Sequence, residues 1–258
     1  MADQIRSFGK DQTTLFFDPD AEPIAEVGDG ERIAVWTADS ICGLWRQMPQ
    51  GGMHIDEVID RLGGACPLTG PFAVDGATAG EVIAVEFHSV DPEPREGTGW
   101  TGLFDGFGAL TTDVYGLQEP LDVGLSPVTY DTDHATIEAG GRARRLPLHP
   151  FLGTVGVAPV RERRMSFSQA PEYLGDVDQP GLTAGATLVL PVNVDGALLS
   201  LGDAHAAQGD GEITGVGIEI EARVEFTVRV SDRTDSRFAA LPQLNTADAI
   251  GSIAGFQG

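Results

Sequence analysis

Lysine is almost absent from this chain of 258 residues, in which Lys10 is the only one. Lysine and arginine together number 16, against 39 aspartates and glutamates, which gives a formal net charge of −23. A surface with so little positive charge repels nucleic acid and anionic lipid, so we expect neither a nucleic acid nor a membrane as a partner. Such acidity is typical of a halophilic protein, in which dense carboxylates keep the molecule hydrated at high salt.

Cysteines and long apolar runs are scarce as well. Cys42 and Cys66 are too few for a disulfide framework, and no Cys-x-x-Cys pair occurs, so we expect a reducing, cytoplasmic setting. A small buried hydrophobe is the commoner role for such cysteines, and a catalytic nucleophile is the alternative. No apolar run reaches the roughly 18 residues that a membrane span needs. Residues 1–12 lack the apolar stretch of a signal peptide.

Long helical patterns and nucleotide-binding motifs are also missing. There is no P-loop, and no G-x-G-x-x-G stands between a strand and a helix, so nucleotide binding is not expected. The 34 glycines and 16 prolines are spread along the chain and indicate many turns. Apolar runs that follow Gly-containing turns predict strands at 31–39, 81–87 and 186–192.

The clearest strand is predicted at 219–230. Its even-numbered residues, from Ile220 to Val230, are apolar and its odd-numbered residues are polar, which is the period of a half-buried strand. Only 54–62 has a convincing short helical pattern, and the tail from Thr246 resembles the start of a helix that does not develop.

These patterns predict a mainly β, β-rich α+β fold with β-sandwich or barrel-like architecture and few short helices. The length suits a single unit over residues 1–258, with two interlocked β subdomains at about 1–160 and 161–258 as an alternative.

The stretch 202–212, GDAHAAQGDGE, contains three carboxylates, one histidine and one glutamine among three glycines. An extended backbone would place Asp203 and His205 on one face, with their Cα atoms about 6.5–7 Å apart. Two such side chains can converge on one metal ion, because zinc binds nitrogen and oxygen ligands at about 2.0–2.2 Å. A solvated acidic turn with an incidental histidine is the alternative that the stretch itself leaves open.

Further candidates lie outside this stretch. Asp39 ends an apolar strand, where side chains emerge at the rim of a sheet, although an aspartate that starts a turn is the common alternative. Asp176 and Asp178 belong to the loop LGDVD, which an ordinary acidic loop would also explain. His54 is expected to be a surface residue at the start of the helix.

Four blocks in order resemble the acetamidase/formamidase family of metal-dependent amide hydrolases. They are VWTAD, TGPFAVDGATAGEVIAVEF, PFLGTVGVAP and PVNVDGALLSLGDAHAAQGDGE. The resemblance begins at about residue 15 and continues to the end of the sequence. One departure is Asp176, which stands where the family's Gly-Gly-Asn-x-Asp loop has asparagine, whereas Asp178 matches. The C-terminal helical segment of relatives is expected to be absent.

The resemblance implies a hydrolase that cleaves the C–N bond of a short-chain aliphatic amide, of formamide or acetamide type, to a carboxylate and ammonia. Relatives also suggest a homodimer. Two alternatives stay open: a non-catalytic β-sandwich module that binds a small molecule or a cation, and a hydrolase of another small C–N compound.

Amide hydrolysis needs a strong nucleophile, stabilisation of the tetrahedral intermediate and a proton for the leaving nitrogen. We expect a divalent metal, with zinc as the first choice and calcium or another divalent ion as an alternative. The expected metal ligands are Asp39, Asp203 and His205. The expected acid/base is Glu212, and the residues expected to hydrogen-bond the substrate amide are Asp178 and Gln208.

The charge of −23 predicts that stability depends on ionic strength. Salt reduces the range of carboxylate repulsion from about 10 Å at 0.1 M to about 3 Å at 1 M, so the unfolding temperature should rise substantially between low and molar salt. Thermal unfolding across a sodium chloride series measures this. A flat or falling unfolding temperature would contradict the halophilic interpretation and leave the prediction of function untouched.

Overall fold

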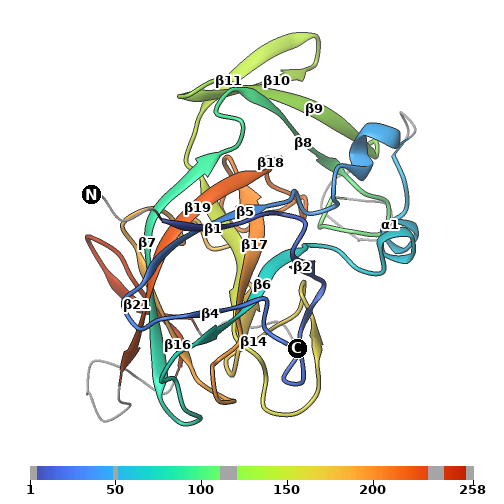
Figure 1. Ribbon diagram of the computed structural model, residues 1–258. Coiled ribbons are helices and arrows are strands. Elements are labelled where there is room, and N and C mark those ends of the chain that lie inside the picture. Colours follow the sequence, from blue (N-terminus) through green and yellow to red (C-terminus); the bar gives the residue numbers. More distant parts are fainter. Residues whose placement is uncertain (1–4, 49–51, 111–120, 232–240, 254–258) are drawn as a thin grey trace.

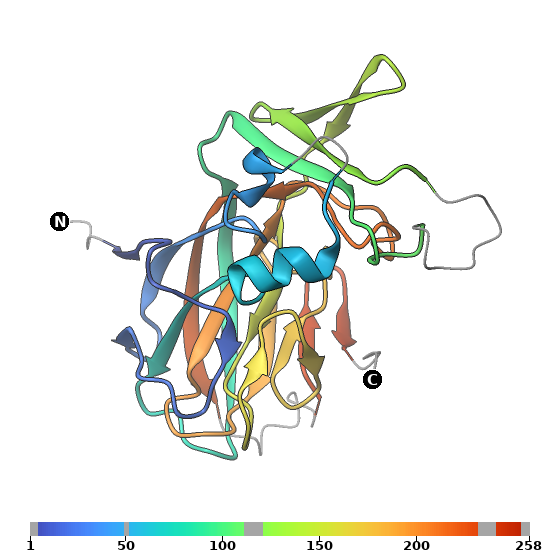
Figure 2. The same cartoon turned by 90° about the vertical axis from the view of Figure 1, so that its right-hand side faces the viewer.

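The computed structural model describes residues 5–48, 52–110, 121–231 and 241–253. Two large β-sheets pack face to face, and a single α-helix among these residues lies at one side of them (Figures 1 and 2). The predicted mainly β, sandwich-like fold with few short helices is confirmed. Within the described ranges, no helix has the length and apolar character needed to cross a membrane.

The first sheet has seven strands, and all neighbours are antiparallel except β1 and β5. Their order is β1 (Arg6–Phe8), β5 (Arg32–Thr37), β19 (Ala222–Ser231), β7 (Val82–Pro92), β16 (Thr187–Pro191), β20 (Gln243–Asn245) and β21 (Ile250–Ser252). The strands predicted at 31–39, 81–87 and 186–192 correspond to β5, β7 and β16 and are confirmed.

The second sheet has twelve strands and carries most of the candidate site. Its main path is β11 (Arg142–Pro147), β10 (His134–Ala139), β9 (Gly124–Tyr130), β8 (Gly97–Leu103), β18 (Glu219–Ile220), β17 (Leu199–His205), β12 (Phe151–Gly156), β15 (Leu174–Asp176) and β14 (Gln169–Ala170). β6 (Leu68–Val74) also pairs with β17, and β2 (Thr13–Thr14) and β4 (Ala25–Val27) pair with β6. A separate small sheet joins β3 (Phe16–Phe17) to β13 (Arg164–Met165). Both large sheets combine strands from before and after residue 160.

The segment predicted as one strand at 219–230 forms two strands in different sheets. β18 pairs with β17 in the second sheet, β19 pairs with β5 and β7 in the first, and the chain passes between them at Glu221. The even-numbered residues are buried as predicted, except that Val230 is half-buried. Glu219 and Thr227, on the face predicted to be polar, are buried too. The burial of Glu219 accompanies the change of sheet, whereas Thr227 is buried within β19.

The helix predicted at 54–62 is confirmed as α1 (Ile55–Leu62), and a short 3-10 helix, η1 (Leu44–Gln47), precedes it. His54 caps α1, because its Nδ1 accepts a hydrogen bond from the backbone N–H of Asp56 at 3.2 Å. It is exposed, as expected. Gly63, with φ of 75°, ends the helix in the left-handed region that glycine adopts without strain.

The tail, which resembles the start of a helix that does not develop, forms the hairpin β20–β21 within the described residues. The backbone N–H of Thr246 donates to the carbonyl of Ala249 at 2.8 Å and closes the turn, and β20 pairs with β16. Pairing with an existing sheet edge outweighs a weak local helical preference, especially with Gly251 in the run. Residues 254–258 lie outside the described part of the chain.

The main apolar core lies between the two large sheets. Phe226 of β19 and Phe72 of β6 meet there with ring centroids 6.5 Å apart. A second, smaller apolar cluster lies near α1 and is separate from the main core; its buried members are Ile41, Met53, Val58, Trp100, Phe104 and Val216. This small cluster becomes one wall of the candidate site.

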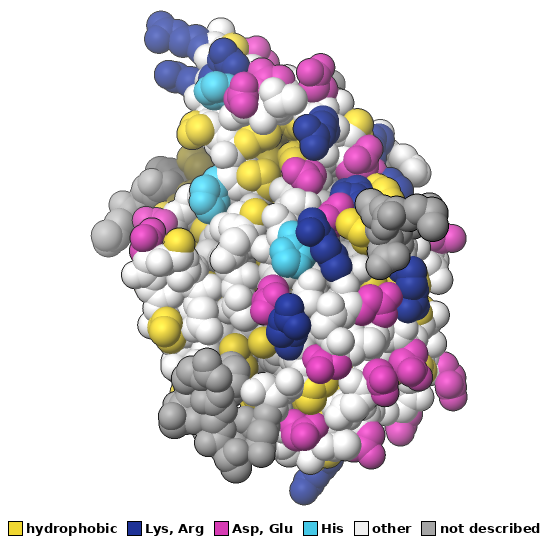
Figure 3. Space-filling model, turned by 60° about the vertical axis from the view of Figure 1, so that its left-hand side comes forward, with side chains coloured by type: hydrophobic (Ala, Val, Ile, Leu, Met, Phe, Trp, Pro, Cys, Tyr) yellow, Lys and Arg dark blue, Asp and Glu magenta, His cyan; other side chains and the backbone are white. Residues whose placement is uncertain are grey.

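The surface is acidic, with ion pairs distributed over it. Arg229 pairs with Glu86 at 3.0 Å, and Lys10 pairs with Glu221. Figure 3 shows acidic side chains scattered over one face and basic side chains at its upper end, where the exposed β10–β11 hairpin projects.

Candidate active site

The end of β17 brings Asp203 and His205 into one buried cluster, as their spacing predicts. Asp203 is 3% exposed and His205 is 1% exposed. Thr154 on the neighbouring strand β12 donates its hydroxyl to Oδ2 of Asp203 at 3.1 Å, and the His205 ring stacks on Phe151 at 4.9 Å. Asp203 has φ of 57°, an uncommon backbone for a residue with a side chain, which marks a strained position of the kind found at functional sites.

Gly153 of β12 leaves the space in which these groups meet. A Cβ atom on Gly153 would lie 2.5 Å from both Oδ1 of Asp178 and Oδ2 of Asp203, and 2.7 Å from Cε1 of His205. Any other residue would therefore push the cluster apart. Gly153, the first glycine of the PFLGTVGVAP block, is therefore explained by this close approach rather than by a turn.

Glu219 is the third member of the buried cluster, and sequence reasoning missed it. Its Oε1 lies 3.0 Å from Nε2 of His205 and accepts the backbone N–H of Gly217 at 3.0 Å, while its Oε2 accepts the hydroxyl of Ser40 at 2.7 Å. One ligand atom each from Asp203, His205 and Glu219 lie within 4.8 Å of one another. The alternating pattern gives no signal for this role, because Glu219 occupies a position that reads as solvent-facing.

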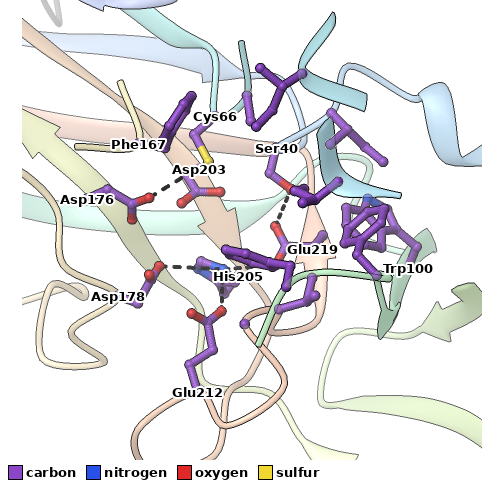
Figure 4. Close-up of a pocket in the computed structure, with 18 residues that line it drawn as sticks. Ser40, Cys66, Trp100, Phe167, Asp176, Asp178, Asp203, His205, Glu212 and Glu219 are labelled. Atoms are coloured by element: carbon purple, nitrogen blue, oxygen red, sulfur yellow. Dashed lines mark hydrogen bonds and ion pairs between the residues drawn. The ribbon is translucent and has the colours of Figure 1, made fainter. Parts of the chain in front are cut away.

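Glu212 and Asp178 approach the same imidazole from loops (Figure 4). Oε1 of Glu212 lies 3.6 Å from Nε2 of His205, and Oδ1 of Asp178 lies 3.8 Å from it. Both residues have φ of 42°, so the backbone of each loop is strained where its carboxylate enters the site. Unlike Glu219, these two side chains are partly accessible from the cavity and are free to meet a ligand.

The site holds an excess of buried negative charge. Burial raises the pKa of Glu212 to about 9, and Asp178 adds to the effect. Burial also raises the pKa of Asp203 to about 7; His205 opposes that rise, and Glu219 adds to it. Burial disfavours the charged imidazole, but the Glu219 and Asp203 carboxylates outweigh it and raise the pKa of His205. No lysine or arginine is among the described residues that line the cavity, so a proton or a bound cation must balance the charge.

Asp39 does not join this cluster, and the predicted ligand set of Asp39, Asp203 and His205 is corrected accordingly. Its Oδ1 accepts the backbone N–H groups of Ile41 at 3.1 Å and Gly43 at 3.0 Å, so the carboxylate is engaged in its own turn. Asp39 instead fixes the turn that presents Ser40 to Glu219. The structure places Glu219 where Asp39 was expected.

Gln208 also lies away from the cluster. Its Nε2 donates to the backbone carbonyl of Asp178 at 2.9 Å, and its side chain lines a different cavity, beside β10 and β11. It therefore supports the loop that carries Asp178, and it is not among the described residues that line the cavity at His205.

The cluster opens into a cavity of about 220 Å³. Cys66 and Asp176 line it near Asp203, with Sγ of Cys66 4.0 Å from Oδ2 of Asp176. Burial raises the pKa of the Cys66 thiol, and the nearby carboxylates of Asp203 and Asp176 raise it further. A raised pKa disfavours the thiolate that a cysteine nucleophile needs. Apart from Ser40 and the groups around His205, the rest of the described cavity wall is apolar.

Comparison with known proteins decides the family. The model of the Acetamidase/Formamidase family matches residues 3–174 and 168–245. This chain belongs to the acetamidase/formamidase family.

Individual relatives agree with that assignment. An acetamidase from Bacillus halodurans of known crystal structure is 31% identical, with a TM-score of 0.78 over 93% of this chain and 74% of that one. The acetamidase of Mycolicibacterium smegmatis is 28% identical over 212 residues, and a putative formamidase of Schizosaccharomyces pombe is 26% identical over 211. These matches cover 62% and 63% of this chain, but only 52% and 50% of the two relatives. The chain thus spans about half the length of the curated relatives that it matches.

The close approach at Gly153 generates a test of the site geometry. Gly153→Ala should lower the free energy of unfolding by about 1–3 kcal/mol, because the added methyl group meets three buried side chains. Gly209→Ala is the matched control: a Cβ there meets nothing within 4 Å, so the change should stay within about 0.5 kcal/mol. Urea unfolding measures both, and equal stabilities of the two variants would contradict the packing described for the cluster.

Proposed function

We propose that this chain is a metal-dependent hydrolase that cleaves the C–N bond of a small amide to give a carboxylate and ammonia. The observation that carries the proposal is the buried set of Asp203, His205 and Glu219, whose ligand atoms lie within 4.8 Å of one another. Membership of the acetamidase/formamidase family, with relatives named acetamidase and formamidase, supports an amide as the substrate. Zinc, the homodimer and the cytoplasmic setting stay predictions from the sequence.

The residues present fit a divalent cation. Oδ1 of Asp203 is buried and has no hydrogen-bond partner among the described residues. A cation at this place would supply the partner that this oxygen lacks. Two carboxylates and an imidazole nitrogen are common zinc ligands, and manganese or iron also accept this mixture. Ser40, Gly217 and Thr154 hold the two carboxylates in place from behind, as supporting groups do around metal ligands. A divalent cation held there would lower the pKa of water and polarise the substrate carbonyl.

Glu212 is the acid/base in this proposal. Its carboxyl group reaches the cavity 3.6 Å from His205, whereas the other oxygens of the buried set are enclosed. A cation held by Asp203, His205 and Glu219 would favour the carboxylate form of Glu212, whereas burial alone favours the protonated form.

Glu212 carries one proton from the attacking water to the leaving nitrogen. Glu212 removes a proton from the attacking water as the water oxygen bonds to the carbonyl carbon. It then delivers that proton to the amide nitrogen as the C–N bond breaks and ammonia leaves. Asp178, facing the same imidazole, accepts a hydrogen bond from the substrate NH₂ group and so orients the amide.

Three variants separate these roles. Glu219→Gln should lose both the cation and ammonia release, because a buried ligand is neutralised. Glu212→Gln should keep the cation and lose about 10²–10⁴-fold in kcat, because an amide cannot accept the proton. Asp39→Asn is the matched control: it preserves the oxygen that accepts from Ile41 and Gly43, so the cation should be retained.

Two measurements are made on chelated and on metal-replete protein. Elemental analysis after dialysis reports the bound metal, and ammonia release from formamide, acetamide and propionamide reports activity. Stoichiometric metal without ammonia release would favour the non-catalytic binding module. Ammonia release that survives chelation and the Glu219→Gln substitution would contradict the metal-dependent mechanism.

A further inference from the structure

The cavity beside the carboxylate cluster is lined by two chemically distinct kinds of side chain. His205 and the acidic groups form one part of the lining, and large apolar side chains form the other part, called here the apolar side. In the close-up, Trp100 and Phe167 lie on opposite sides of the acidic groups (Figure 4). The large apolar residues that line the cavity are Ile41, Ile55, Ile59, Trp100, Phe104, Phe107, Phe167 and Val216.

Several separate elements build the apolar side. α1 contributes Ile55 and Ile59, one helical turn apart and both only half-buried, so this face of the helix borders the cavity. β8 contributes Trp100, which packs edge-to-face on Phe104 with ring centroids 5.8 Å apart. Trp100 and Phe104 belong to the small apolar cluster and Ile55 packs against it, so this part of the wall is anchored outside the main core.

Phe107 reaches the cavity because residue 215 is glycine. A Cβ atom on Gly215 would lie 2.6 Å from Cε1 of the Phe107 ring, so the ring lies directly against the backbone that follows Glu212. Phe107 is 41% exposed and Phe167 is 37% exposed, although both line the cavity. Large aromatic side chains left partly open around a pocket are typical of surfaces that a ligand covers.

The volume of the cavity is greater than a formyl or acetyl group requires. A cavity of about 150 Å³ in another protein holds benzene, whereas this one measures about 220 Å³. It therefore has room for a six-carbon group together with a carboxamide. Acetamide, with one methyl group, would leave most of the apolar wall without contact.

The charge of the cavity restricts that group further. No basic residue is among its described lining residues, whereas five acidic residues are. An acyl group that ends in a carboxylate would be repelled and unpaired, whereas a neutral hydrocarbon would bury apolar surface against Ile59, Phe107 and Phe167.

We propose that the preferred substrate is a primary amide with a neutral, apolar acyl group of about five to seven carbons, aliphatic or aromatic. This rests on the proposed amide hydrolysis and replaces the formamide and acetamide preference that the family resemblance implies. The carboxamide lies at Glu212 and Asp178, and the hydrocarbon lies between α1, Trp100 and the Phe107 ring.

The test is a comparison of kcat/KM for ammonia release from acetamide, butanamide, hexanamide and benzamide by the metal-replete protein. Hexanamide should exceed acetamide by at least about 10-fold, since even one methylene in an apolar pocket can contribute that much. Benzamide should have a lower KM than acetamide, because its ring also fills the apolar side.

Two variants test whether the apolar wall causes the preference. Phe107→Ala removes part of the wall, and Ile59→Phe fills the cavity from α1, so each should lower the hexanamide-to-acetamide ratio of kcat/KM by about 10-fold. Val160→Ala is the control. Val160 is an exposed apolar residue that is not among the cavity-lining residues, and its loss should leave the ratio and the rates unchanged.

The outcomes separate this inference from the function on which it rests. Acetamide hydrolysed faster than hexanamide, or a ratio that Phe107→Ala and Ile59→Phe do not change, would overturn the inference and leave amide hydrolysis standing. No ammonia from any of the four amides would overturn the proposed function and this inference together.

Discussion

The enclosure of acidic side chains around one imidazole is the constraint on which the rest of this structure depends. Asp203, Glu219, Glu212 and Asp178 all approach His205, and no lysine or arginine is among the described residues of the cavity. Such a concentration of like charge is costly away from water unless it is neutralised. A cation of the kind we propose, bound between the carboxylates and the imidazole, would offset their repulsion and desolvation, and its binding free energy would then be part of the folding free energy.

The fold accommodates this cluster by local departures from regular geometry. The chain leaves the second sheet at Glu221, so β18 turns the side chain of Glu219 into the site while β19 continues in the first sheet. Asp203 has a left-handed backbone within a strand, and Gly153 opposite it has no side chain to obstruct the contact. The small apolar cluster near α1 is a second departure, because it forms a wall of the cavity instead of joining the main core. The strained residue Asp203 and the apolar wall therefore border the same cavity.

The sequence predicted those features that depend on local periodicity. Apolar runs after Gly-containing turns identified β5, β7 and β16. A period of two identified the buried face of 219–230 and placed Asp203 and His205 on one face. It did not predict which distant residue completes the set, because that depends on strand pairing: β18 lies beside β17 in the second sheet, and Glu219 is the cross-strand partner of His205. Asp39 ends a strand near the site but uses its carboxylate in a turn, whereas Glu219 follows an ordinary alternating pattern. Gln208 lies in the same block as His205, yet the bend after β17 directs it to the carbonyl of Asp178.

We propose that Asp203, His205 and Glu219 hold a divalent cation. Anomalous X-ray diffraction from crystals of the metal-replete protein, measured on both sides of the zinc absorption edge, tests this most directly. The account predicts one strong anomalous peak within bonding distance, about 2.0–2.2 Å, of an oxygen of Asp203, Nε2 of His205 and an oxygen of Glu219. A peak bound by Asp39, or no peak and a His205–Glu219 contact unchanged from 3.0 Å, would contradict it.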